Sequence, residues 1–65
     1  MSYIEFAKRI KCLIRLIEGG NTGTAEELAT RLGVSRRTIF SYIAHIEDDG
    51  YVVAYCRQRK TFYFK

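Results

Sequence analysis

The amino-acid sequence predicts a mainly helical α+β domain in which three helices are followed by a C-terminal β-hairpin. Apolar residues recur at spacings of three and four over residues 3–48, which is the period of helices that bury one face. Glycine-containing breaks at residues 19–23 and at Gly33 divide this part of the chain into three segments. Residues 51–65 are instead rich in β-branched and aromatic residues, which favour strands.

The first helix is expected over about residues 3–18. Its apolar stripe consists of Ile4, Phe6, Ala7, Ile10, Leu13, Ile14 and Ile17. Ser2 is a suitable N-cap, and the Gly-Gly pair at 19–20 ends the helix. Tyr3 and Leu16 widen the stripe beyond what one small core needs. Two interpretations follow: additional packing within the domain, or a homodimer contact along this helix.

The second helix is expected over about residues 25–32. Thr24, with Glu27 three residues later, has the pattern of a capping box. The predicted inward residues are Leu28, Ala29 and Leu32, and the predicted outward residues are Glu26, Glu27, Thr30 and Arg31. Gly33 then suits the left-handed conformation that ends many helices, and Val34 fills the turn.

The third helix is expected over about residues 36–48, with Ser35 as its N-cap and Asp49-Gly50 as its end. The predicted inward row is Ile39, Ile43 and Ile46, with Phe40 beside it. A capped helix, a turn through glycine and a second capped helix form the outline of a helix-turn-helix. That motif places its second helix in the major groove of DNA.

The last part of the chain is predicted to be a strand-turn-strand hairpin. The two strands are expected within residues 51–56 and 61–64, and the tip between them is Arg57-Gln58-Arg59-Lys60. Because this connection contains no Gly, Asn or Pro, a longer and mobile loop is expected rather than a tight primed turn.

Composition is consistent with one basic, globular domain of 65 residues. The hydrophobic fraction of 48% is sufficient for a compact core, and the net charge of +4 suits a polyanionic partner. No apolar run approaches the roughly 18–20 residues that span a bilayer, and no signal-peptide pattern begins the chain. We therefore expect no membrane partner and a cytoplasmic location.

The reactive side chains predict no active site. Cys12 and Cys56 fit no metal spacing, and they are interpreted as buried thiols, with a disulfide between them left open. His45 is the single histidine and has no serine, cysteine or carboxylate placed to form a catalytic relay with it. No enzyme activity, cofactor or metal is predicted.

The middle of the chain resembles a known family. Residues 27–40, continuing through Ile43 and Ile46 to Asp49-Gly50-Tyr51, are similar to the DNA-binding domains of DeoR-type and biotin-repressor-type transcription regulators. The resemblance implies a winged helix-turn-helix fold and sequence-specific DNA binding in a bacterial-type, nucleoid-associated setting. Relatives often have an Arg-Asp pair where this chain has Ser41-Tyr42, so the base contacts should differ.

The resemblance has a second point of difference. Relatives usually continue into an effector or oligomerisation domain, whereas this chain ends with the hairpin, or wing. No small-molecule effector site is therefore expected in it, and it would be a stand-alone binder or the reading domain of a larger regulator.

The candidate DNA-binding residues lie at the start and on the outward side of the third helix, and at the hairpin tip. They are Ser35, Arg36, Arg37, Thr38, Ser41, Tyr42, His45, Arg57, Arg59 and Lys60. Arginines at the helix start suit guanine edges, and Tyr42 suits a thymine methyl or a phosphate. The basic tip suits the DNA backbone or the minor groove.

Two other functions are compatible with the same sequence. Winged helices also serve as protein–protein modules, and the apolar excess on the first helix would favour such a role. Binding of RNA or single strands is the third hypothesis, with Tyr51 or Tyr63 as a stacking platform. The arginines at the third helix and at the hairpin tip favour double-stranded DNA.

Overall fold

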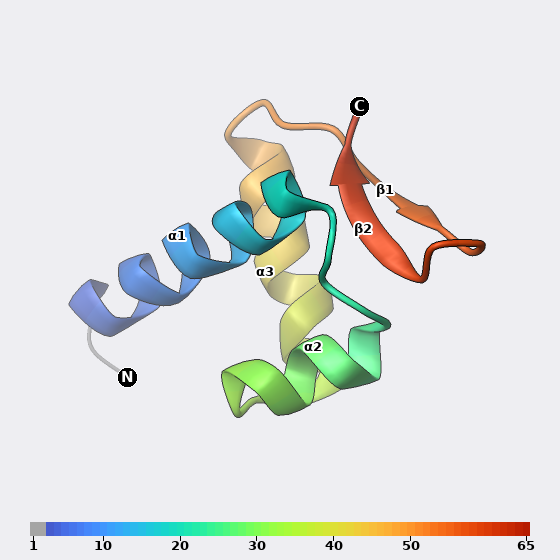
Figure 1. The fold of residues 1–65 in the computed structure, drawn as a ribbon. Helices are drawn as coiled ribbons and strands as arrows, with labels where there is room; N and C mark the ends of the chain where they lie inside the picture. Colours follow the sequence, from blue (N-terminus) through green and yellow to red (C-terminus); the bar gives the residue numbers. More distant parts are fainter. Residues whose placement is uncertain (1–2) are drawn as a thin grey trace.

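A computed structural model describes residues 3–65 and confirms the predicted fold class of three helices followed by a two-stranded hairpin. The elements are α1 (Tyr3–Gly19), α2 (Ala25–Leu32), α3 (Arg36–Asp48), β1 (Val53–Cys56) and β2 (Thr61–Phe64) (Figure 1). The domain measures 35 × 25 × 18 Å. The predicted cap at Ser2 lies outside the described residues.

Helix α1 packs on the domain from Phe6 onward, and only its first turn is left uncovered. Ile10, Leu13 and Ile17 are buried, and Leu16 is half-buried against the same core. The first turns project beyond the other helices (Figure 1), and the side chains of Tyr3 and Ile4 are 84% and 66% exposed. The prediction that Ile4 faces the core is therefore wrong, because no other element reaches that end of α1.

The turn between α2 and α3 has the geometry predicted for it. Gly33 adopts the left-handed conformation, with φ 70° and ψ 33°. The N–H of Gly33 donates to the carbonyl of Thr30 at 3.2 Å, and the N–H of Val34 donates to that of Ala29 at 2.9 Å. Val34 is half-buried against the core, so the turn is closed by both backbone and side-chain contacts.

The core forms where α1, α2, α3 and β2 meet. Its buried residues are Ile10, Leu13, Ile17, Leu28, Ala29, Ile39, Tyr42, Ile43, Ile46 and Phe62. The predicted row of isoleucines on α3 is thus confirmed. Phe40 lies beside this row as predicted, but its side chain is 51% exposed.

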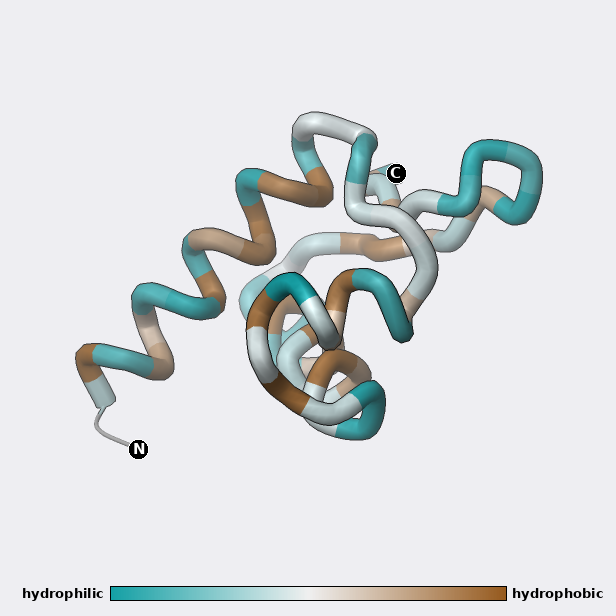
Figure 2. Tube along the Cα trace, turned by 60° about the horizontal axis from the view of Figure 1, so that its bottom comes forward, coloured by the Kyte–Doolittle hydropathy of each residue, from teal (hydrophilic) through white to brown (hydrophobic). Residues whose placement is uncertain are grey.

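The wing is an antiparallel pair in which Val53 lies opposite Phe64 and Cys56 lies opposite Thr61. Strand β1 begins at Val53, two residues later than the predicted strand segment. A four-residue turn over 57–60 joins the strands, and Lys60 closes it with a positive φ of 53°. The hydrophilic tip of this hairpin stands away from the helices (Figure 2).

A pair of buried threonines fastens the wing to the loop between α1 and α2. The backbone N–H of Thr22 donates to Oγ1 of Thr61 at 3.0 Å, and the N–H of Phe62 donates to Oγ1 of Thr22 at 2.9 Å. Because Phe62 belongs to the core, these bonds hold the wing in one position relative to α1 and α3.

The two cysteines are free, and the prediction that both are buried is wrong for Cys12. Cys12 is exposed on α1 because it lies on the face opposite Leu13 and Ile17, whereas Cys56 is partly buried in β1. Among residues 3–65, no helix has the length and the hydropathy needed to span a bilayer.

Candidate nucleic-acid interface

Helix α3 begins at the surface with a well-formed cap. The N–H of Thr38 donates to Oγ of Ser35 at 3.2 Å, and the hydroxyl oxygens of the two residues lie 2.9 Å apart. Ser35 itself is extended, with φ −78° and ψ 159°. The first turn of a helix carries partial positive charge and amides without intrahelical partners, so this end of α3 suits an anion.

The outward face of α3 is a continuous exposed row. It consists of Arg37, Ser41, Ala44 and Asp48, which follow one another at spacings of three and four residues. The row lies opposite the buried isoleucines of the same helix, since successive residues are separated by about 100°. A groove that accepted α3 would therefore meet Arg37 and Ser41 first.

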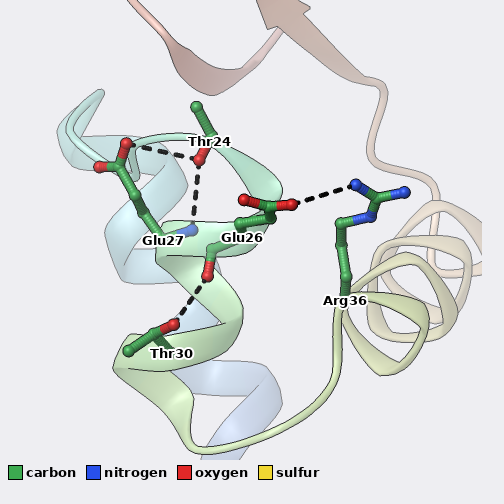
Figure 3. Close-up of polar contacts among 5 residues, drawn as sticks. All are labelled: Thr24, Glu26, Glu27, Thr30 and Arg36. Atoms are coloured by element: carbon green, nitrogen blue, oxygen red, sulfur yellow. Dashed lines mark hydrogen bonds and ion pairs between the residues drawn. The ribbon is translucent and has the colours of Figure 1, made fainter.

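Arg36 lies at the start of α3 and points towards α2. Its Nη1 is 3.5 Å from Oε1 of Glu26, and both side chains are exposed (Figure 3). Glu26 lies in the first turn of α2, beside the cap in which the N–H of Glu27 donates to Oγ1 of Thr24 at 3.2 Å. The ion pair links the exposed starts of the two helices of the motif.

Tyr42 is not on the exposed face, and its predicted contact with DNA is wrong. Its side chain is 3% exposed, and its ring packs edge-on against Phe6 of α1, with centroids 5.5 Å apart. Position 42 lies on the flank of the isoleucine row that α1 covers. The hydroxyl of Tyr42 is buried and has no hydrogen-bond partner among residues 3–65.

His45 is exposed but lies on the same flank of α3 as Tyr42. Its ring centroid is 5.0 Å from that of Phe6, again edge-on. With Asp49 and apolar residues of α1 it lines an open groove of about 320 Å³ between α1 and the end of α3. Because His45 follows Ser41 by four residues, it lies next to the exposed row, on the side that faces α1.

The basic residues of the wing tip are all exposed. Arg57, Arg59 and Lys60 occupy the turn that joins β1 to β2, at the end of the hairpin farthest from its junction with α3 (Figure 1). They form a second cationic group, separate from the one at the start of α3. The two groups belong to separate elements whose relative position depends on the Thr22–Thr61 bonds.

An apolar recess, which no sequence pattern predicted, lies where the start of α2, α3 and the wing meet. The recess has a volume of about 250 Å³ and is lined by Ala25, Phe40, Tyr55 and Phe62. Phe40 follows Arg36 by one helical turn. This spacing was the sequence signal that Phe40 lies near the exposed arginines. The position of Phe40 beside the buried isoleucine row concealed this signal.

Nothing in the described part of the chain assembles metal ligands. Across residues 3–65, no three His, Cys, Asp or Glu side chains gather closely enough to hold an ion. The acidic residues Glu47, Asp48 and Asp49 are exposed at the end of α3, opposite its basic start. The features of the candidate interface are therefore its basic side chains, the start of α3 and the apolar recess.

Comparison with known proteins identifies one family. Its model, described as HTH domain, matches residues 8–59, from the first half of α1 to the wing tip. No curated protein matches the chain significantly, and no solved structure does so. The matched region includes the whole of α2, the turn at Gly33 and α3.

Proposed function

Because this chain belongs to the HTH, or helix-turn-helix, domain family, we propose that it binds double-stranded DNA in a sequence-specific manner. It would act as a transcriptional regulator or as the DNA-reading domain of one. The observation that carries this proposal is the exposed, capped start of α3, which bears Arg36 and Arg37 next to the outward row. A cytoplasmic, nucleoid-associated location in a bacterial-type cell belongs to the same proposal.

Helix α3 enters the major groove with its start leading. Arg37 donates two parallel hydrogen bonds to a guanine edge, a contact that contributes about 1–3 kcal/mol of base discrimination. Ser35, Thr38 and Ser41 bind phosphates or base edges near it. Arg36 exchanges its exposed partner Glu26 for a phosphate.

The charge along α3 supports this orientation. The basic residues are at its start, whereas Glu47 and Asp48 are in its last turn. A polyanion attracts the first end and repels the second, so the start of α3 approaches the duplex and its end points away. His45, exposed one turn after Ser41 on the flank beside α1, lies at the edge of this contact.

The wing positions the domain on the duplex. Arg57, Arg59 and Lys60 contact the backbone or an adjacent minor groove, which adds affinity without specifying the sequence directly. The threonine bonds that hold the wing keep these contacts at a constant distance from those of α3.

Two copies of the chain bind as a homodimer through α1. The exposed Tyr3 and Ile4 continue into the groove lined by Phe6, Ala7 and Ile10, an apolar surface that the domain itself leaves uncovered. A single helix and wing read only a short site, so pairing supplies the affinity and specificity that a regulator needs.

Fluorescence-anisotropy binding to a randomised duplex pool across a salt series, followed by sequencing of the bound DNA, tests this function. A recurring sequence motif together with a steep salt dependence is the expected result. An inverted repeat in that motif would support the dimer. Equal affinity for every duplex would restrict the function to nonspecific binding.

A protein–protein module is the competing function, and the uncovered apolar end of α1 is the observation that favours it. If the chain failed to bind any duplex at low salt, DNA binding would be rejected and α1 would become the surface to test for a protein partner. Preference for single strands over duplexes would instead indicate stacking on Tyr51 or Tyr63, which are both exposed on the wing side.

A further inference from the structure

We propose that Phe40 reads the 5-methyl group of a thymine, which enters the apolar recess that Phe40 forms with Ala25, Tyr55 and Phe62. This inference rests on the DNA binding proposed above and adds a base preference to it. The thymine methyl is the one apolar group that base pairs present in the major groove, so it is the natural occupant of an apolar surface there.

The exposure of Phe40 is the first argument. Its side chain is 51% exposed, although Ile39 and Ile43 on the same helix are buried. Phe40 follows Arg36 by one turn and precedes Ser41, so it belongs to the part of α3 that a major groove would surround. A large apolar side chain in that position contacts base edges when the helix is inserted.

The construction of the recess is the second argument. Tyr55 of β1 packs against Phe62 of β2, with ring centroids 4.9 Å apart and ring planes at 60°. Phe62 is buried in the core, so this aromatic pair is a firm wall facing Phe40. A methyl group that enters between the wing and α3 loses water on several sides at once.

The surrounding charge identifies the occupant as DNA rather than an apolar peptide. Arg36 lies one turn before Phe40, and Arg57 lies two residues after Tyr55. The acidic side chain nearest to the recess along the chain, Glu26, is paired with Arg36. An apolar group flanked by phosphates matches this pattern of an apolar centre between cations.

The test uses the duplex selected by this chain, with each thymine replaced in turn by deoxyuridine. This replacement removes the 5-methyl group and keeps every hydrogen-bonding group of the base. At one thymine, we expect a loss of about fourfold in affinity, which is the value of one buried methylene-sized group. A comparison of cytosine with 5-methylcytosine at the same position then tests the methyl group in another base, and the methylated duplex should bind more tightly.

The Phe40→Ala variant supplies the second half of a double-mutant cycle. It should bind thymine and deoxyuridine duplexes equally at that position, and Phe40→Leu should keep part of the preference. The control is Val52→Ala, which truncates another exposed apolar side chain, in the segment before β1, and should keep the full thymine preference. Circular dichroism establishes that each variant is folded.

The outcomes separate this inference from the proposed function. A selected DNA motif in which every thymine tolerates deoxyuridine would overturn the role of Phe40 and leave sequence-specific binding intact. A thymine preference that survived Phe40→Ala would assign the methyl contact to another residue and would also overturn it. Failure to bind any duplex would reject both the inference and the function on which it rests.

Discussion

The hydroxyl oxygens of Thr22 and Thr61 lie 3.1 Å apart, although 39 residues separate them in the sequence. Both side chains are buried, and each accepts a hydrogen bond from a backbone N–H: Thr61 from Thr22, and Thr22 from Phe62. The loop after α1 thereby supplies the polar partners that the inner edge of β2 needs. The wing is attached to the helices by this pair as well as by Phe62.

Removal of one hydroxyl from this pair should destabilise the fold. Thr61→Val keeps the side-chain shape but leaves the buried N–H of Thr22 without an acceptor, which costs about 1–3 kcal/mol. Denaturant unfolding measures the change. Thr30→Val is the matched control, because the Thr30 hydroxyl donates to the Glu26 carbonyl at an exposed site. Equal stability of both variants would show that the buried bonds contribute nothing.

The sequence predicted the helix ends and the turn well, because residues only a few positions away determine these features. Caps at Thr24 and Ser35 and the left-handed Gly33 act through residues a few positions away, and the structure contains them. The Thr22–Thr61 pair has no such signal. Its two members meet only after three helices have packed, and a threonine in a loop is ordinarily a surface residue.

The two aromatic residues of α3 likewise depend on long-range packing that the sequence pattern does not predict. Phe40 and Tyr42 lie on opposite flanks of the buried isoleucine row, and the helical period permits either of them to be covered. Phe6 of α1 covers Tyr42, while the wing stops short of enclosing Phe40. Tertiary packing decides which of the two rings is covered, so the sequence pattern wrongly predicted Tyr42 to face outward and did not predict the exposure of Phe40.

Alanine substitutions at Gly33 and Gly19 should change the stability of the domain in opposite directions. Gly33→Ala forces an L-residue into φ 70°, which costs roughly 1–2 kcal/mol. Gly19→Ala falls in the last turn of α1, where an added Cβ meets nothing within 4 Å, and should stabilise by about 0.5–1 kcal/mol. Thermal or denaturant unfolding of the two variants measures both changes. A stabilising Gly33→Ala would be inconsistent with the turn described above.

The division of labour between helix and wing predicts different mutant behaviour on DNA. Arg37→Ala should lose about 1–3 kcal/mol on the selected duplex and relax the preference at one base. Arg59→Ala should weaken binding to all duplexes about equally. It should also lower the slope of log affinity against log salt concentration by about 1. Arg15→Ala removes the same charge from the outer face of α1 and is the control. Indistinguishable profiles for Arg37→Ala and Arg59→Ala would reject the division.

Release of Arg36 from its acidic partner should strengthen DNA binding. Glu26→Gln removes a negative charge near the expected phosphate and frees the guanidinium, which should raise affinity by about fivefold or less. Stability should change by less than about 1 kcal/mol, because the ion pair is exposed. Glu18→Gln, on α1, makes the same charge change elsewhere and should alter affinity less. An unchanged affinity for Glu26→Gln would separate Arg36 from the phosphate contacts.

The exposed end of α1 predicts the behaviour of the chain in solution. Ile4→Glu places a charge in the uncovered apolar surface and should convert the proposed homodimer to a monomer in sedimentation velocity. Because Ile4 is mostly exposed, the monomer should keep its fold. Gln58→Glu adds the same charge at the wing tip and should leave the dimer unchanged. A wild-type chain that sediments as a monomer at high concentration would contradict the dimer.

The 35 Å length of the domain has a consequence for how sites are spaced. One turn of B-form DNA is about 34–36 Å long, so a copy bound with its long axis along the duplex would extend over roughly one turn on one face. A second site displaced by half a turn faces the opposite side of the rod. Paired sites should therefore cooperate with a helical periodicity, strengthening and weakening as the separation passes through successive turns of about 10 base pairs.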